Sequence, residues 1–346
     1  MDIPVSGTKP TSGKLTYKDN QLIGGILTID DYIVTINGNN VTADKGTSPI
    51  SIVTTGDGLY ASDEIGRYIY RGSNPNNYIW LDENGDGVKA NDNSEMYRII
   101  SYEDDGTIKV IKNSVIGNMA WDTQNTRKNS NNTYCNSNNG CNVWSNSAKT
   151  LYNGVSLGDN FHYEYYNADT DTTKTSTSSG TVNDESSLNI YLNSTWLNSV
   201  SGISDNIISH NFSVGAWYSS GPNKPNARHK EEINSYVWNG KIGLMNLIEF
   251  KEASTASTCD NLFKLVSGGN CHTENWMFIS HDRPVWLLSA YPNGGSNIVW
   301  NVFPPGSVGS SYAYGECGVR PAFYLKSSIS LEGMGTEDEP YKIVTE

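Results

Sequence analysis

The sequence predicts an α+β protein built from antiparallel or mixed sheets with two or so short helices. Strand-like runs separated by turns occupy the first third of the chain and return after Trp276. A helical spacing of apolar residues occurs in the middle, over Ser187–Ser199 and near Leu244–Ala253. Because strands and helices do not alternate regularly, a parallel sheet with crossover helices is not expected.

Residues 1–49 are expected to form a small β unit, separate from a larger unit over residues 50–346. The strand-like run from Ile26 to Ile36 is interrupted by a turn at Asp30–Asp31, and Asn37–Asn40 is a hairpin signal. Two or three short strands bury too little apolar surface to fold alone. We therefore expect the small unit to depend on the larger one.

The larger unit begins with strands. Residues 68–81 predict strand, loop and strand, and Asp104–Gly106 is the turn of a hairpin. Residues 164–186 are rich in Thr, Ser and Asp and are expected to form an exposed loop. Ser187 is expected to cap the helix over Ser187–Ser199. Its apolar positions lie three to four residues apart, at Leu188, Tyr191, Leu192, Trp196 and Leu197.

The charge and composition exclude two classes of partner. The formal net charge is −13, whereas phosphate binding needs a basic surface, so we expect no nucleic-acid partner and no anionic membrane surface. No run of 18 apolar residues is present, so no membrane span is expected. Tyr (21) and Trp (9) exceed Phe (7), which suits an extracellular protein with many turns and polar-tipped aromatic side chains.

Five cysteines support an oxidising location. Cys135 and Cys141 bracket one loop and Cys259 and Cys271 bracket another, so each pair is expected to form a disulfide. Free buried thiols are the alternative for both pairs. Cys317 remains unpaired and is expected to be a buried small apolar side chain beside a strand.

One loop resembles part of a calcium site. Asp82, Asn84 and Asp86 place oxygen atoms at the first, third and fifth positions of an EF-hand-type loop, and Gly87 at the sixth permits the sharp turn. The twelfth position is Asn93 instead of Glu, and the flanking residues are strand-like. A hairpin rich in Asp, Asn and Gly explains these residues without a metal and is the favoured interpretation. Calcium is the one cofactor left open.

The segment from Asn275 to Leu325 points to recognition. The strand-like runs Val285–Ser289 and Asn297–Val302 alternate with loops rich in Gly, Asn, Ser and Tyr. Tyr and Trp give a large contact area at low entropic cost, and Ser, Gly and Asn give adaptable hydrogen bonds. The ligand-binding side chains are expected to be Tyr291, Asn293, Asn297, Trp300, Tyr312 and Tyr314. The strands Val285–Ser289, Ile298–Val302 and Val319–Lys326 should be buried. Most tryptophans should be core, with Trp300 and Tyr291 as the aromatic residues expected at the surface.

No catalytic arrangement is evident. The histidines are scattered and none lies in a metalloprotease or triad motif; they are His162, His210, His229, His272 and His281. Arg320, before Pro321, is expected to be a buried ion-pair partner that closes the terminal strand.

Residues 10–43 resemble the β-rich segment of type IV pilin-like proteins of Gram-positive gut bacteria. The resemblance covers PTSGKLTYKDNQLIGGILTIDDYIVTINGNNVTA. In that family a hydrophobic helix precedes this segment and anchors the subunit in membrane and filament. The resemblance implies that such a helix, and any targeting segment, precede the printed sequence.

Residues from about 56 to 341 resemble an uncharacterised family of bacterial surface domains with a C-type-lectin-like fold. The matching blocks include GRYIYRGSNPNNYIW, WNGKIGLMNLIEF, VWLLSA and GVRPAFYLK, in order and at similar spacing. The same broad fold hosts sugar-binding lectins, formylglycine-generating enzymes and the hypervariable proteins of diversity-generating retroelements. The lectin calcium motifs are incomplete here, since Tyr291–Asn293 and Trp300–Val302 lack the required acids. The reactive cysteine pair of the enzymes is also incomplete, because only Cys317 lies nearby.

These resemblances lead to an expected function. The chain is expected to be a non-enzymatic, extracellular subunit of the cell surface or of a pilus, a minor pilin or tip adhesin. Its partners would be other pilin subunits and a glycan or protein on a host or bacterial surface. Two alternatives stay open, an enzyme of the formylglycine-generating type and a retroelement-diversified binding protein. In a retroelement-diversified protein, the residues in the binding loops differ between copies because adenines in their codons are mutated. The positions whose residue types fit such codons are Asn293, Asn297, Asn301, Ser307, Ser310, Tyr312 and Tyr314.

Overall fold

The computed structural model of the chain is mostly β-sheet with few helices. It describes two sets of residues. The first set is four strands between residues 12 and 45, and the second is the body between residues 52 and 344, with gaps. In the body the described ranges are 52–61, 67–123, 135, 138–145, 161–167, 172–180, 185–214, 217–218, 237–257, 272–291, 297–304 and 306–344.

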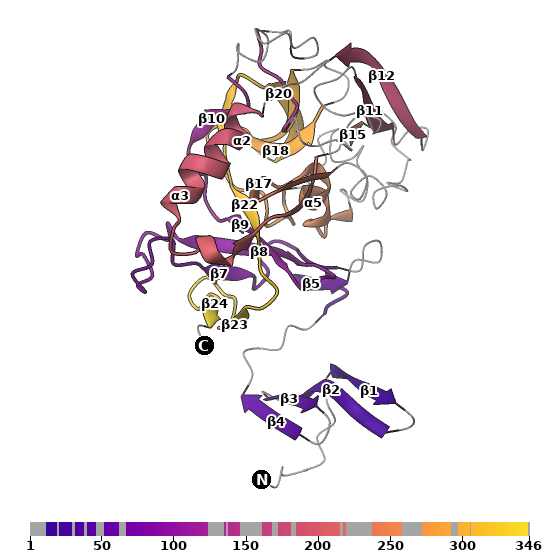
Figure 1. Cartoon of the computed structure of the whole chain (residues 1–346), viewed down its shortest axis with the longest axis vertical. Helices are drawn as coiled ribbons and strands as arrows, with labels where there is room; N and C mark the ends of the chain where they lie inside the picture. Colours follow the sequence, from indigo (N-terminus) through magenta and orange to yellow (C-terminus); the bar gives the residue numbers. More distant parts are fainter. Residues whose placement is uncertain are drawn as a thin grey trace.

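The N-terminal strands form an antiparallel sheet of their own, in the order β1-β2-β3-β4 (Figure 1). Their bounds are β1 Ser12–Lys18, β2 Gln21–Ile29, β3 Tyr32–Asn37 and β4 Asn40–Lys45. Both turns predicted from the sequence are confirmed, because Ile29 pairs with Tyr32 and Asn37 pairs with Asn40.

An eight-stranded sheet forms the first layer of the body. Its main path runs β13-β22-β9-β8-β6-β5, with β17 beside β22 and β7 beside β8. The predicted hairpin turn at Asp104–Gly106 is confirmed, since it joins β8 to β9. The strands are β5 Gly58–Ala61, β6 Tyr68–Arg71, β7 Tyr78–Trp80, β8 Met96–Tyr102, β9 Ile108–Lys112, β13 Ile207–Ile208, β17 Ile242–Gly243 and β22 Ala322–Leu325.

A five-stranded mixed sheet in the order β10-β21-β18-β19-β20 carries the loops of interest. β18 and β21 are parallel, and the other pairs are antiparallel. The framework strands expected to be buried are buried, apart from partial exposure at Ile298 and Lys326. The strands are β10 Asn118–Ala120, β18 Val285–Ala290, β19 Ile298–Phe303, β20 Ser307–Tyr312 and β21 Glu316–Gly318.

The expectation of a loop over residues 164–186 is wrong. This region contributes to an antiparallel pair, β11 Phe161–Asn167 and β12 Thr172–Gly180, with β15 Trp217–Tyr218 parallel to β11. Thr and Tyr favour extended backbone, and that preference outweighs the polar composition. Two further ribbons pair β14 His210–Ser213 with β16 Val237–Gly240, and β23 Ser330–Glu332 with β24 Lys342–Val344.

The helix predicted over Ser187–Ser199 is confirmed. It consists of α2 (Ser187–Tyr191), a π-helical turn (Leu192–Trp196) and α3 (Leu197–Ser199). The cap is Ser186 instead of Ser187, because Ser186 has extended backbone angles and its hydroxyl accepts from the N–H of Asn189. The Asn193 side chain lies in the π-helical turn and donates to the carbonyls of Asn189 and Ile242, so it joins the helix to β17.

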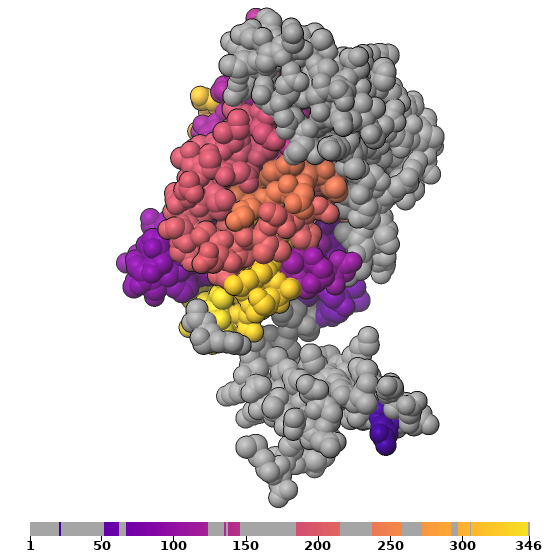
Figure 2. Space-filling model, in the orientation of Figure 1, coloured from indigo at the N-terminus to yellow at the C-terminus, as the bar shows by residue number. Residues whose placement is uncertain are grey.

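The second predicted helix is α5, Leu247–Glu252. Asn246 and Glu249 form a reciprocal capping box at its start. On the face seen in Figure 2, the segment 185–214 covers the body beside the segment 237–257. None of the helices in the described ranges is long and apolar enough to cross a membrane.

The core of the body is rich in tryptophan and contains paired charges. The Trp121 and Trp144 rings meet edge to face with centroids 4.9 Å apart, and Trp144 meets Trp238 at 5.7 Å. Lys109 and Glu249 form an ion pair in which both side chains are only 1% exposed. Such groups are tolerated inside a protein because each charge has a partner.

Candidate ligand-binding face

Two tyrosines project into solvent where β20 ends. Tyr312 is 49% exposed and Tyr314 is 52% exposed, and their ring centroids lie 6.0 Å apart. Ala313 between them is fully buried. Ala313 and Tyr314 lie in a turn that follows β20, in which the N–H of Gly315 donates to the carbonyl of Tyr312 at 2.8 Å. This turn buries Ala313 and leaves both tyrosines exposed. We call Tyr312 and Tyr314 the tyrosine rim.

The backbone of the rim is held by segments that are distant in sequence. The N–H of Tyr314 donates to the carbonyl of Asn139 at 3.1 Å, and the N–H of Ala313 donates to the carbonyl of Asn297 at 2.8 Å. The Ala313 carbonyl accepts from the N–H of Asp122 at 3.0 Å. These contacts use main-chain atoms alone, and the phenol rings keep their exposure.

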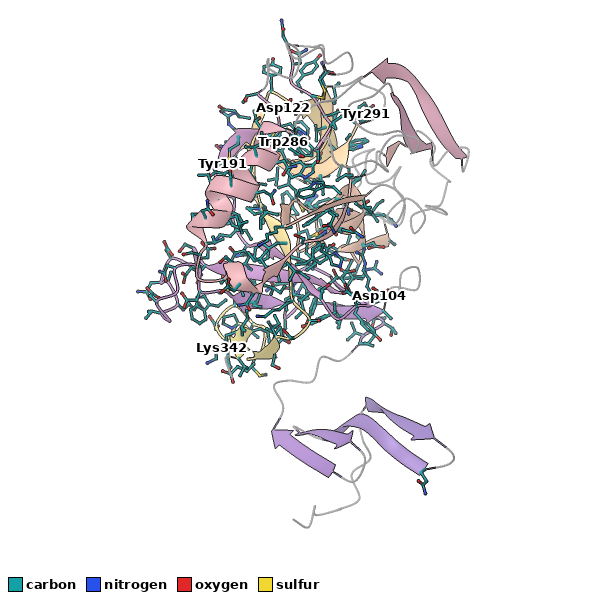
Figure 3. The ribbon with its side chains drawn as sticks, viewed as in Figure 1. Asp104, Asp122, Tyr191, Trp286, Tyr291 and Lys342 are labelled. Carbon is teal, nitrogen blue, oxygen red and sulfur yellow. A yellow bond between two sulfur atoms is a disulfide. The ribbon has the colours of Figure 1, made fainter. Side chains whose placement is uncertain are left out.

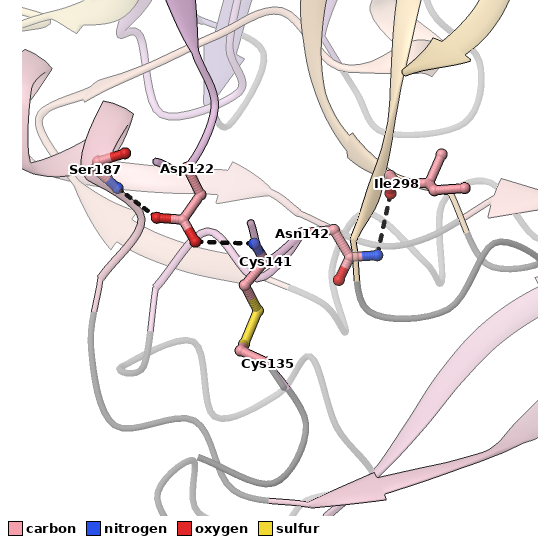
Figure 4. Close-up of a disulfide and its surroundings, with 6 residues drawn as sticks. All are labelled: Asp122, Cys135, Cys141, Asn142, Ser187 and Ile298. Carbon is pink, nitrogen blue, oxygen red and sulfur yellow. Dashed lines mark hydrogen bonds between the residues drawn. A yellow bond between two sulfur atoms is a disulfide. The ribbon is translucent and has the colours of Figure 1, made fainter. Parts of the chain in front are cut away.

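Beneath the rim, the buried Asp122 carboxylate joins two segments (Figure 4). One oxygen accepts from the N–H of Cys141 at 2.8 Å and the other from the N–H of Ser187 at 3.1 Å. Asn142 adds a bond to the Ile298 carbonyl at 3.0 Å, so the loop is also tied to β19. No motif marks Asp122 in the sequence, because its role depends on chain segments that only the fold brings together.

The first expected disulfide is present. Cys135 and Cys141 are bonded, with their Cα atoms 5.1 Å apart, and close the loop that contains Asn139. Gly140 in this loop has φ +75°, and a Cβ there would lie 2.3 Å from the Asp122 carbonyl oxygen. The tight approach of the loop to the rim therefore requires glycine. Cys259 and Cys271 lie outside the described residues, so the second disulfide stays a prediction.

The expected exposure of Trp300 is wrong. Its side chain is 2% exposed, because β19 lies between β18 and β20 and Trp300 faces the core. Tyr291 is partly buried and packs edge to face on Trp300, with centroids 4.6 Å apart. Figure 3 shows Tyr291 at the same end of the body as Trp286 and Asp122, away from Asp104 and Lys342.

The other residues expected to contact a ligand differ in their exposure. Asn297 is partly buried and supports Ala313 through its carbonyl, and Asn293 lies outside the described residues. Asn301, one of the positions considered for diversification, is fully buried. Of the predicted set, Tyr312 and Tyr314 are the described side chains most available to a partner.

Cys317 is a buried free thiol, as expected. Burial raises its pKa to about 11, although the side chains of Asn301 and Ser311 oppose the shift. The thiolate is the nucleophile and metal ligand of cysteine, so a thiol with this pKa is poorly suited to either role.

The loop at residues 82–87 is a hydrogen-bonded turn. The Asp82 carboxylate accepts from the N–H groups of Gly85, Asp86 and Gly87, the closest at 2.8 Å. The Asn84 amide oxygen accepts from the N–H of Asp86. These bonds support the favoured interpretation as a turn, and calcium binding by Asp82, Asn84 and Asp86 stays a prediction. Among the described residues, no group of three or more His, Cys, Asp and Glu side chains is arranged to hold a metal.

Arg320 is buried as expected, but the expected ion pair is wrong. Its Nε donates to the Lys112 carbonyl at 2.9 Å and its Nη1 to the Met277 carbonyl at 2.7 Å. Both acceptors are neutral main-chain oxygens. The fold brings the end of β9 and the segment around Met277 to the guanidinium, and no carboxylate of the described residues is within ion-pair distance of it.

Comparison with known proteins gives a match to a family model that covers less than half of the chain. Residues 163–327 match the sequence model of a family described as a domain of unknown function (DUF6273). The match includes the α2 helix, the tyrosine rim and β22. β22 pairs with β9, which precedes the matched range, so the folded sheet extends beyond it. No curated protein and no solved structure matches the chain significantly.

Proposed function

We propose that this chain is a non-enzymatic recognition subunit displayed outside the cell, as a minor pilin or tip adhesin. The observation that supports the proposal best is the tyrosine rim, two adjacent exposed aromatic side chains on a backbone held by three separate segments. Aromatic side chains dominate binding hot spots because they bury a large area and lose few rotamers. A backbone held in advance reduces the ordering cost of binding.

The tyrosine rim lies at the end of the body that would face away from the point of attachment. β20, which leads into the rim, lies at one end of the body, whereas β5 and the β23–β24 ribbon lie at the other (Figure 1). The body begins beside β5, so a subunit attached through the residues before β5 would present the rim outward. The partners in this proposal are other pilin subunits on the attachment side and a surface glycan or protein on the rim side.

The C-type-lectin-like fold is part of the proposal. A mixed sheet whose loops carry the candidate site, next to a larger sheet that joins early and late strands, is compatible with that fold. Since folds do not determine function, the argument for recognition depends on the rim. The high pKa of the buried Cys317 argues against the formylglycine-generating alternative. The retroelement-diversified alternative is favoured only by the exposure of Tyr312 and Tyr314.

The test is a binding screen with the whole 346-residue chain. Wild-type protein and a Tyr312→Ala/Tyr314→Ala variant would be applied to arrays of glycans and of cell-surface proteins. We expect the variant to lose a signal that the wild type gives, with an unchanged melting temperature, because exposed side chains contribute little to stability.

The matched control is Tyr68→Ala. Tyr68 is 40% exposed on β6, in the eight-stranded sheet. This variant should keep the wild-type signal. Binding that survives in the double variant, or that is lost equally in Tyr68→Ala, would place the site elsewhere.

A further inference from the structure

Two buried arginines have no carboxylate partner in the described part of the chain, unlike three other buried cations. Lys109 pairs with Glu249, Lys112 pairs with Glu83, and Arg67 pairs with Glu252. Arg98 and Arg320 are 5% and 1% exposed. Among the described residues, neither has a carboxylate within ion-pair distance, and every acceptor recorded for them is neutral.

Arg320 has more hydrogen-bond donors than acceptors around it. A guanidinium carries five N–H groups, two of them on Nη2. Nε and Nη1 reach the carbonyls of Lys112 and Met277, but Nη2 is buried and finds no acceptor in the described part of the chain. A buried donor without an acceptor is costly, and more so when it belongs to a charged group.

Arg98 adds a second positive charge nearby. Its guanidinium donates to the side-chain oxygens of Asn77 and Asn74 and to the Pro75 carbonyl. It also lies 3.9 Å from the Tyr78 ring centroid and 4.9 Å from that of Trp276. The next residue after Trp276 is Met277, whose carbonyl Arg320 contacts, so the two arginines flank one short segment.

Burial disfavours the charged form of both arginines. Burial lowers the pKa of Arg98 to about 10, although Tyr78, Glu337 and Asp57 oppose the shift. For Arg320, burial and the charge of Arg98 both lower the pKa, to about 9. Arginine nevertheless keeps its proton in proteins, so deprotonation does not relieve the cost. A desolvated cation beside a like charge requires a negative charge in its neighbourhood.

We propose that a small monovalent anion, such as chloride, binds beside Nη2 of Arg320. A halide accepts hydrogen bonds from several directions, which suits a guanidinium edge that has no acceptor in the described part of the chain. The anion would lie where the end of β9 and the segment around Met277 meet, because Arg320 contacts both and stands just before β22. This site is independent of the tyrosine rim and of the proposed function.

A single buried water is the competing occupant. Water would satisfy an N–H group but would leave the positive charge of Arg320 without compensation. The two occupants differ in one measurable respect, since only the anion makes stability depend on the anion concentration.

The experiment is urea unfolding of the whole chain at constant ionic strength, with sodium chloride replaced stepwise by sodium gluconate. Gluconate is too large for a closed site. We expect the free energy of unfolding to rise with chloride, approaching about 1.4 kcal/mol for each tenfold increase above the dissociation constant. Bromide should substitute for chloride and give an anomalous diffraction peak beside Arg320. Equal stability in chloride and gluconate, with no bromide peak, would overturn the proposal in favour of water.

Variants separate this site from a general salt effect. Arg320→Met should abolish the chloride dependence, and Arg98→Gln should weaken it, because each removes one positive charge. Arg283→Gln is the matched control, since Arg283 is 48% exposed beside Glu316 and should keep the wild-type dependence. If Arg320→Met does not fold, the chloride dependence of Arg98→Gln and the bromide peak of the wild type still test the proposal. A dependence that survives in Arg98→Gln at full strength, without a bromide peak, would contradict the site.

Discussion

The eight-stranded sheet and the tyrosine rim are stabilised in different ways. The sheet is packed with aromatic and aliphatic side chains and includes buried charges that need partners, of which Lys109 and Glu249 are the most completely buried pair. The rim is held by main-chain hydrogen bonds, by the Asp122 carboxylate and by a disulfide. The stabilising groups of the rim lie beneath its surface.

This difference matters for recognition. In the sheet, nearly every large side chain is used for packing, so a change there should alter stability first. At the rim, Tyr312 and Tyr314 can change without the loss of a recorded hydrogen bond from their side chains. A surface built in this way can vary its contact residues while its backbone stays in place. The predictions below test the difference by the size of their effects on stability.

The largest effect is expected from Lys109→Met. The substitution keeps most of the side-chain volume but leaves the Glu249 carboxylate buried without its cation. It also removes a cation that lies 5.0 Å from the ring centroids of both Phe212 and Tyr324. Loss of one partner of a buried pair costs about 3–5 kcal/mol, which urea unfolding would measure.

The double variant Lys109→Met/Glu249→Gln is the control. The introduced glutamine would keep an amide oxygen to accept from the N–H of Asn246, as the Glu249 carboxylate does now. The double variant should therefore recover a large part of the lost stability, because no unpaired charge remains. A double variant no more stable than the single one would mean that packing, and not charge, dominates at this position.

A smaller effect is expected from Asp122→Ala. Two N–H groups, a buried one of Cys141 and a partly buried one of Ser187, would lose their acceptor. At roughly 1–3 kcal/mol for each unsatisfied group, partly relieved by water, we expect a loss on the order of 3 kcal/mol. The variant should also weaken any ligand binding at the rim, whereas Lys109→Met should weaken it only near its melting temperature. Full binding by a destabilised Asp122→Ala protein would show that the rim does not depend on this carboxylate.

The disulfide is expected to contribute less. In the loop-entropy account, a bond with a sequence separation of 6 stabilises the fold by about 2 kcal/mol. Cys135→Ser/Cys141→Ser should lose this amount in calorimetric melts, and a reducing agent should lower the stability of the wild type similarly. The double variant in the same reducing agent is the control, and it should be indifferent to the reagent unless another disulfide is present. If the reducing agent lowers the stability of the double variant further, the predicted Cys259–Cys271 disulfide is supported.

The general architecture could be predicted because it depends on local signals. Asn37–Asn40 and Asp104–Gly106 define their turns through residues that favour tight backbone geometry. The helix over Ser187–Ser199 follows from apolar spacing. The expected loop at residues 164–186 is wrong because the strand preference of Thr and Tyr outweighs the polar composition. The predicted cap, Ser187, lies one residue from the observed cap, Ser186, because either serine can accept the same kind of bond.

The candidate site was harder to predict, because exposure depends on which strand lies next to which. Tyr312 and Trp300 look equally suitable for binding in sequence. Only the strand order places Trp300 inside and Tyr312 outside. Asp122 and Arg320 show the same limit, since their partners lie more than ten residues away in the chain. A hydrogen bond between distant segments leaves no local pattern to detect.

A substitution in the loop at residues 82–87 should lower the free energy of unfolding only modestly. Asp82→Ala removes the acceptor for three backbone N–H groups in an exposed turn, where water can replace it, so we expect a loss of about 1 kcal/mol. A separate melt with calcium and then with excess chelator tests the metal prediction. If calcium binds, the two melting temperatures should differ and Asp86→Ala should remove the difference. Equal temperatures would leave the hydrogen-bonded turn as the complete account.

The smallest effect is expected from Asp105→Asn, in the turn between β8 and β9. Partial burial acts to raise the pKa of Asp105, but hydrogen bonds from Thr107 and from the His210 ring outweigh it and hold that pKa below its usual value. A carboxyl with a lowered pKa stabilises the fold fully above its unfolded pKa, near 3.8. That contribution is lost as the pH falls through the folded value. Urea unfolding between about pH 5 and pH 2 should therefore show a shallower decline for Asp105→Asn than for the wild type. Because Asp105 is half exposed, solvent screening keeps the difference small. If the unfolding free energies of the two proteins depend on pH in the same way, the exposed Asp105–His210 pair contributes nothing measurable to stability. In that case only the buried charge pairs of the sheet stabilise it, and the contrast with the rim becomes sharper.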